Sequence, residues 1–214
     1  MSYFYTLVSV FVSAILAFHL DDPIVIERPQ NKVEWGDVML EYDPSQTPID
    51  NHTIYVSIRI FNAKWQSEVL SLDFEMLERW TDSRLRFQEK EAKVLLPKTQ
   101  HIWTPETYFV DSIRDEILRE ATLITNLGEV IRRERRHLEI PCTLHSNMTL
   151  CDLGIGSYSA TSQPQFEYAV TEFGYTKTSI LGNYLVATKM QKSLDGDKQR
   201  IAVISLQILF NQQK

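Results

Sequence analysis

The chain has 214 residues, of which 43% are hydrophobic and 23% charged, a composition typical of a folded globular protein and not of a disordered one. The formal net charge of −6 argues against nucleic acid as a partner, because phosphate backbones are bound by basic surfaces. The length suits a single all-β domain, since such domains often run to about 200–250 residues.

The chain begins with an apolar segment. Residues 3–18 carry no charge, and the stretch is short for a bilayer span but placed where a secretory signal lies. No Lys or Arg precedes it and no clear small-x-small cleavage site follows, so a buried N-terminal strand is the alternative. We expect residues 1–17 to be a signal peptide and residues 18–214 to form one domain. No later segment is apolar enough for a membrane span, which predicts a secreted, extracellular protein.

Sequons and cysteines agree with an extracellular setting. Asn51 and Asn147 each begin an Asn-x-Thr triplet, the acceptor for N-glycosylation. Cys142 and Cys151 are the two cysteines of the chain. Such a pair forms two free thiols in a cytosolic protein or one disulfide in a secreted one. Because of the signal-like start, we expect the disulfide.

Apolar and polar residues alternate along three segments, at residues 53–60, 70–76 and 202–210. A period of two is typical of strands with one buried and one solvated face. The pattern predicts an all-β fold, an antiparallel, immunoglobulin-like β-sandwich. In the third segment, Val203, Ser205 and Gln207 are expected to face solvent.

Turns and one helix complete the predicted fold. Glycine, proline, asparagine and aspartate mark turns at residues 43–44, 126–128, 154–156 and 195–197. A short helix is expected over residues 32–41.

The strongest charge cluster is residues 132–137 (Arg-Arg-Glu-Arg-Arg-His). Such a run is typical of a solvated hairpin strand. On a strand, residues 131, 133 and 135 share one face, and residues 132, 134 and 136 share the other. The acidic balance of the chain argues against a nucleic-acid interface here.

Motifs for catalysis are missing from the sequence. It contains no Gly-x-Ser-x-Gly elbow, no phosphate loop and no dinucleotide fingerprint, and its five histidines are scattered. We therefore expect no enzyme, no metal site and no cofactor.

Six short segments, read in order, resemble a known family. Residues 40–43 (Leu-Glu-Tyr-Asp) resemble the end of its N-terminal helix, and residues 80–85 (Trp-Thr-Asp-Ser-Arg-Leu) its Trp-x-Asp-x-Arg-Leu signature. Residues 102–109 contain Trp-Thr-Pro-Glu-Thr-Tyr-Phe, similar to Trp-x-Pro-Asp-x-x-Phe.

The remaining matches are a hairpin glycine at Gly128, the first cysteine at the expected distance from it, and Gly-Ser-Tyr at residues 156–158 in place of Gly-Ser-Trp. Together the segments resemble the extracellular domain of the pentameric Cys-loop ligand-gated ion channels. The soluble acetylcholine-binding proteins are the nearest parallel.

The resemblance implies a ring of five identical subunits with small-molecule sites at their boundaries. One subunit would contribute loops A, B and C, and its neighbour strand positions D and E. The positions carried over are Tyr108 and Val110 (A), Tyr158 (B), residues 191–199 (C), Glu75 (D), and Leu123, Ile131 and Arg133 (E).

Departures from the family pattern point to a different ligand. Relatives that bind quaternary ammonium surround it with aromatic faces. Here position D is Glu75, and the loop C tip has neither an aromatic residue nor paired cysteines. Glu75 and Arg133 suit a cationic, zwitterionic or amphiphilic ligand. Only eight residues separate the two cysteines, fewer than in the channels, and the Phe-Pro-x-Asp motif between them is missing.

The sequence therefore favours a secreted, soluble, homopentameric ligand-binding protein. Two alternatives stay open. One is a receptor subunit truncated before its membrane helices, and the other is a monomeric structural β-sandwich without a small-molecule site.

Overall fold

The computed structural model describes residues 33, 35–49, 53–88, 93–145, 148–158, 167–176, 180–192 and 198–209. The expected signal peptide, both sequon asparagines and the predicted turn at residues 195–197 lie outside these ranges. The strands all belong to the unit Asn31–Lys214.

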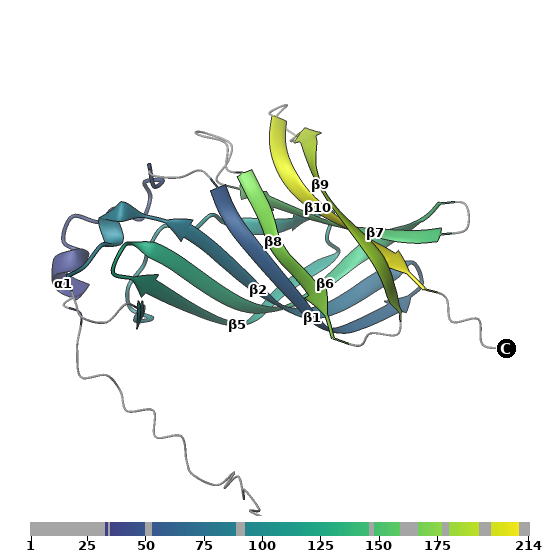
Figure 1. The fold of residues 1–214 in the computed structure, drawn as a ribbon, viewed down its shortest axis with the longest axis horizontal. Helices are drawn as coiled ribbons and strands as arrows, with labels where there is room; N and C mark the ends of the chain where they lie inside the picture. Colours follow the sequence, from purple (N-terminus) through teal and green to yellow (C-terminus); the bar gives the residue numbers. More distant parts are fainter. Residues whose placement is uncertain are drawn as a thin grey trace, which may run out of the picture. The chain divides into compact units, whose positions relative to one another are not determined.

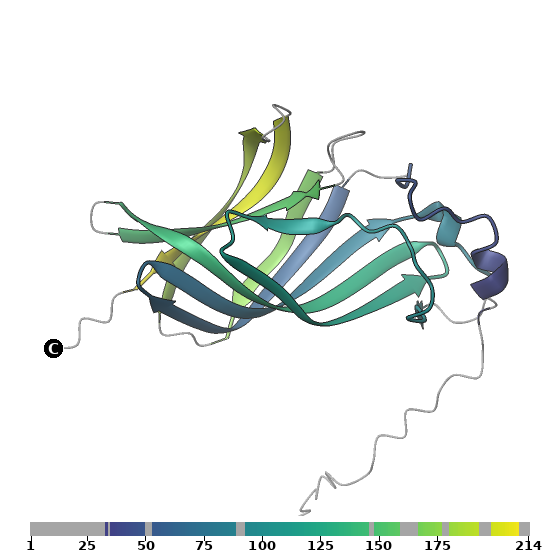
Figure 2. The same ribbon diagram turned by 180° about the vertical axis from the view of Figure 1, so that it is seen from behind.

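The strands form two sheets that share one strand (Figures 1 and 2). Sheet A contains β1 (Thr53–Gln66), β2 (Val69–Thr81), β3 (Lys93–Leu95), β5 (Arg114–Thr125), β8 (Glu167–Tyr175) and most of β6 (Glu129–His145). Sheet B contains β4 (Thr107–Val110), β7 (Met148–Ser157), β9 (Leu181–Lys192), β10 (Lys198–Ile208) and the end of β6. The predicted all-β sandwich is confirmed.

Strand directions add one feature that the sequence does not predict. The pairs around β2, β6, β7 and β10 are antiparallel, but β1 and β8 run parallel, with Ile54 opposite Tyr168. Apolar alternation shows which face of a strand is buried and carries no information on the direction of its neighbour.

The core follows the predicted alternation on β1 and β2. The inward side chains are at most 2% exposed: Ile54, Val56, Ile58, Ile60, Leu70, Leu72, Phe74 and Met76. Phe74 of sheet A meets Phe109 of sheet B edge-to-face, with ring centroids 5.5 Å apart. This aromatic contact joins the two layers and adds to the area that they bury.

Strand β10 departs from the prediction. Ala202, Ile204, Leu206 and Ile208 face the core as expected, but Val203 is also buried, at 2% exposure. Val203 and Ile201 form a second apolar cluster with Val110, and Tyr108 packs against it. The prediction that Val203 faces solvent is wrong, because Val110 of β4 packs in one cluster with it and with Ile201.

The helix is shorter than predicted. Helix α1 covers Trp35–Val38 and is followed by a turn, whereas the sequence predicted residues 32–41. Gly36 lowers helix propensity, and Trp35, Val38 and Met39 pack against the core. Among the described residues, no helix is long and apolar enough to cross a membrane.

The motif at residues 80–85 forms a buried polar junction. Asp82 is fully buried and accepts hydrogen bonds from Arg84 Nε at 2.8 Å and from the Tyr42 hydroxyl at 2.8 Å. Tyr42 in turn accepts from the Trp103 backbone N–H at 2.9 Å. The predicted turn at Gly128 is present, with φ of 80°, and Asp82 N donates to Gly128 O at 2.8 Å. A Cβ at Gly128 would lie 2.5 Å from Asp82 O, so this close approach requires glycine.

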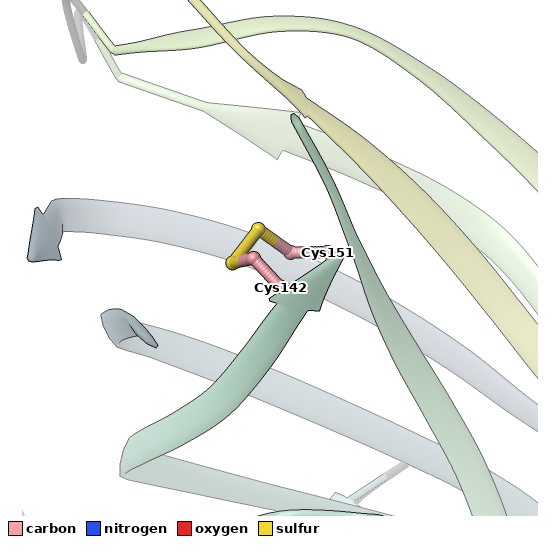
Figure 3. The surroundings of a disulfide bond; sticks show 2 residues. All are labelled: Cys142 and Cys151. Atoms are coloured by element: carbon pink, nitrogen blue, oxygen red, sulfur yellow. A yellow bond between two sulfur atoms is a disulfide. The ribbon is translucent and has the colours of Figure 1, made fainter. Parts of the chain in front are cut away.

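The predicted disulfide is confirmed. Cys142 and Cys151 lie directly opposite each other on β6 and β7 and are bonded (Figure 3). Cys151 is fully buried in the core. The bond closes the short hairpin at the point where β6 passes from sheet A to sheet B.

Removing this bond tests its contribution. Replacing both cysteines with alanine should lower the free energy of unfolding by about 2.5–3 kcal/mol, because closing a ring of about ten residues restricts the unfolded chain. Equilibrium urea unfolding measures the change. The unchanged chain with its disulfide reduced should shift in the same direction. If the urea midpoint and the slope of the unfolding transition stayed the same, the disulfide would not stabilise the domain as proposed.

Candidate functional site

Two tyrosines stack on the outer surface of sheet B. Tyr108 lies on β4, and Tyr158 follows β7, with its backbone N–H donating to Glu106 O at 3.3 Å. The ring centroids are 4.1 Å apart with an interplanar angle of 23°. Tyr158 is 66% exposed, whereas burial raises the pKa of Tyr108. Since the rings contact each other, a ligand would meet the open face of Tyr158 and not lie between the two rings.

Two glycines allow this arrangement. Gly154 and Gly156 lie inside β7, opposite Val110 and Tyr108 of β4. A Cβ on Gly156 would lie 3.0 Å from the Tyr108 ring, and one on Gly154 would lie 2.9 Å from Val110 Cβ. The predicted turn at residues 154–156 is therefore wrong, because these glycines permit close approach of side chains within a strand.

The sequence also predicts ligand contacts on this face from Val110 and from loop C. Val110 is only 6% exposed and packs with Ile201 and Val203 beneath Tyr108, so it supports the tyrosine and has little surface for a ligand. The loop C tip lies outside the described residues. The strands that lead to it, β9 and β10, pair as far as Lys192 and Lys198.

A pocket opens on the outer surface of sheet A. Arg133 lies opposite Leu77, two residues along β2 from Glu75, and Arg133 Nε is 2.8 Å from Glu75 Oε1. The side chains of Glu75 and Arg133 are 32% and 66% exposed. The pocket has a volume of about 190 Å³. Its lining residues are Ser57, Ile58, Arg59, Glu75, Leu77, Arg133, Glu172 and Gly174.

The two remaining strand positions lie next to this pocket. Leu123 pairs with Ile131, and Ile131 pairs with Arg79, two residue pairs beyond Leu77–Arg133. Neither Leu123 nor Ile131 lines the pocket.

Sequence reasoning missed six of the residues that line the pocket: Ser57, Ile58, Arg59, Leu77, Glu172 and Gly174. Leu77 shares the outer face with Glu75 by the period of two, so the pattern alone could have identified it. Ser57 on β1 and Glu172 on β8 line the pocket because β8 pairs with β1. That parallel pairing leaves no signal in the local sequence.

The tyrosine pair and the pocket face opposite ways. On β4, Phe109 points inward to Phe74, so its neighbour Tyr108 points outward from sheet B. On β2, Phe74 points inward, so Glu75 points outward from sheet A. Side chains on the two outer faces of one sandwich cannot enclose the same small molecule.

The chain matches a known protein-family model. The family described as the neurotransmitter-gated ion-channel ligand binding domain matches residues 33–172. The chain belongs to this family. Its members are extracellular ligand-binding domains and not enzymes. No individual curated protein matches the chain.

The interior of this ligand-binding domain holds charged groups that the sequence placed in solvent. In the run 132–137, Glu134 is fully buried and Arg136 is 3% exposed. They form an ion pair of 2.6 Å, and Arg136 also contacts Asp115 at 2.7 Å. The expected solvated strand is wrong for this face, because sheet B covers it. The opposite face, with Arg133 and Arg135, is exposed as expected.

The role of Gly156 can be tested directly. In Gly156→Ala the new Cβ should push the Tyr108 ring away from Tyr158 and lower the free energy of unfolding by about 1 kcal/mol. The tyrosine near-ultraviolet circular dichroism reports the change in stacking. Gly36→Ala is the matched control, because nothing lies within 4 Å of its Cβ. Identical spectra for Gly156→Ala and the unchanged protein would contradict the account.

Proposed function

We propose that this domain belongs to a secreted homopentamer, similar to the acetylcholine-binding proteins, that binds a small zwitterion between neighbouring subunits. The tyrosine pair of one subunit would face the pocket of the next. The placement of the two on opposite faces of one sandwich supports this, since only two copies can bring them together. The uncharged start of the chain and the disulfide support secretion.

The ion pair that lines the pocket carries the proposal. Glu75 and Arg133 neutralise each other across 2.8 Å in a partly exposed setting, where such a pair contributes about 0–1 kcal/mol. A ligand with one ammonium and one anionic group can therefore replace their mutual contact at little cost. Its ammonium group would meet Glu75 and its anion Arg133, while Leu77 contacts its apolar part.

Tyr158 would complete the site from the neighbouring subunit. A ring face attracts a cation, and Tyr158 presents an exposed ring. With one open aromatic face in place of a full cage, recognition depends more on the two charges than it does for a quaternary ammonium ion. A purely cationic ligand would leave Arg133 without a partner.

Binding of defined probes tests the proposal. Glycine betaine and γ-aminobutyrate offer both charges, and choline offers only the positive one. We expect at least one zwitterion to bind the unchanged protein more tightly than choline. Glu75→Ala and Arg133→Ala should each weaken it at least tenfold, about 1.4 kcal/mol, by isothermal titration calorimetry.

A matched control uses another ion pair of sheet A. Arg114 and Glu116 lie 2.6 Å apart, are about half-exposed and do not line the pocket. Arg114→Ala should leave the affinity unchanged. Equal affinities across all variants would refute the pocket, and a monomer in analytical ultracentrifugation would instead favour a structural β-sandwich.

A further inference from the structure

A cluster of charges lies between the two sheets. We call Glu78, Glu134, Asp115, Arg132 and Arg136 the interior cluster. Glu134 forms ion pairs with Arg132 at 2.7 Å and with Arg136 at 2.6 Å. Arg136 also pairs with Asp115 at 2.7 Å, at the edge of the interior. Both arginines are thus committed to partners other than Glu78.

Glu78 is the member without a cation of its own. It is fully buried on β2, and none of the ion pairs within the described part of the chain includes it. Its Oε1 accepts a hydrogen bond from the Thr107 hydroxyl of β4. Its Oε2 is buried and has no hydrogen-bond partner among the described residues. An ionised carboxylate would leave a charged oxygen without a partner in the core, which is strongly unfavourable.

The charge balance of the cluster leads to the same conclusion. Three carboxyl groups, on Glu78, Glu134 and Asp115, face two guanidinium groups, so one negative charge is in excess when all are ionised. Arg132 is further occupied by exposed Glu120, at 2.9 Å. A single proton on Glu78 would bring the interior cluster to neutrality.

We propose that Glu78 holds a buried proton in the folded domain and that releasing it alters the Glu78–Thr107 hydrogen bond between β2 and β4. Burial first, and then the nearby charge of Glu134, raise the pKa of Glu78 to about 7, while Thr107, Arg132 and Arg136 act in the opposite direction. The other polar group that faces it is Tyr168 of β8, whose hydroxyl lies 2.7 Å from Thr107 Oγ1. Burial raises the pKa of Tyr168, so it stays neutral beside Glu78.

Glu78 and Thr107 each adjoin, in the sequence, a residue that faces outward from the sandwich. Glu78 lies between Leu77 and Arg79, which face outward from sheet A, and Thr107 directly precedes Tyr108. The Glu78–Thr107 hydrogen bond therefore joins β2 and β4, whose outward-facing side chains include Leu77 of the pocket and Tyr108 of the tyrosine pair. Proton control of ligand binding rests on the proposed function, but proton binding itself does not, and it can be measured without any ligand.

The pH dependence of stability follows from the direction of the shift. The ordinary pKa of 4.5 applies to the unfolded chain, and the folded value is about 7. The folded state therefore binds the proton more tightly, and the stability gained below pH 4.5 is lost as the pH rises to 7. Glu78→Gln removes this dependence. The unfolding constant of the unchanged protein, divided by that of the variant, should rise by up to about tenfold per pH unit across this window and then level off.

Carbon-13 nuclear magnetic resonance of the unchanged domain gives the direct test. The Glu78 carboxyl carbon, assigned by its loss in Glu78→Gln, should titrate near pH 7, and the Thr107 methyl signal should move with the same midpoint. Glu75→Gln, an outward change on the same strand, should leave both signals in place.

Two results would overturn the inference. One is a Glu78 midpoint near 4.5, and the other is a Thr107 signal that does not follow Glu78. Should Glu78→Gln fail to fold, Thr107 in the unchanged protein still reports the midpoint. Neither result bears on ligand binding at the outer faces.

Discussion

The strict alternation of side chains along β2 is the constraint on which this domain depends. Phe74, Met76 and Glu78 point into the sandwich, while Glu75 and Leu77 point out of it. Because β2 pairs with β1 on one side and β6 on the other, its register fixes both the core and the pocket. A slip of one residue would exchange the two faces and destroy both.

The same alternation of side chains along β4 produces an outward surface on sheet B. Phe109 and Thr107 contact β2, so Tyr108 between them must point outward, where Gly156 leaves room for its ring. The chain belongs to a family of ligand-binding domains. Glu78 and Thr107 join β2 and β4 by a hydrogen bond inside the sandwich.

The features that depend on residues close together in the chain could be predicted from the sequence. The alternation on β1 and β2 and the turn at Gly128 follow from residue type and short spacing, and the disulfide is expected from the signal-like start of the chain. The parallel pairing of β8 with β1 does not, because it joins segments more than a hundred residues apart in the chain. The local sequence predicts a turn at Gly154 and a solvated Glu134, and both predictions are wrong for the same reason: the environment of each residue is set by a partner from a distant strand. The pocket pair came from the family resemblance, and its close contact needed the structure.

A cross-link between copies tests the central claim, that the tyrosine face of one subunit meets the pocket of the next. Leu77→Cys and Tyr158→Cys place one thiol on each outer face, and these cannot react within one sandwich. Mild oxidation of the double variant, followed by a non-reducing gel, should give a ladder of linked chains, with neither single variant doing so. A double variant that stays at the size of one chain would contradict the claim.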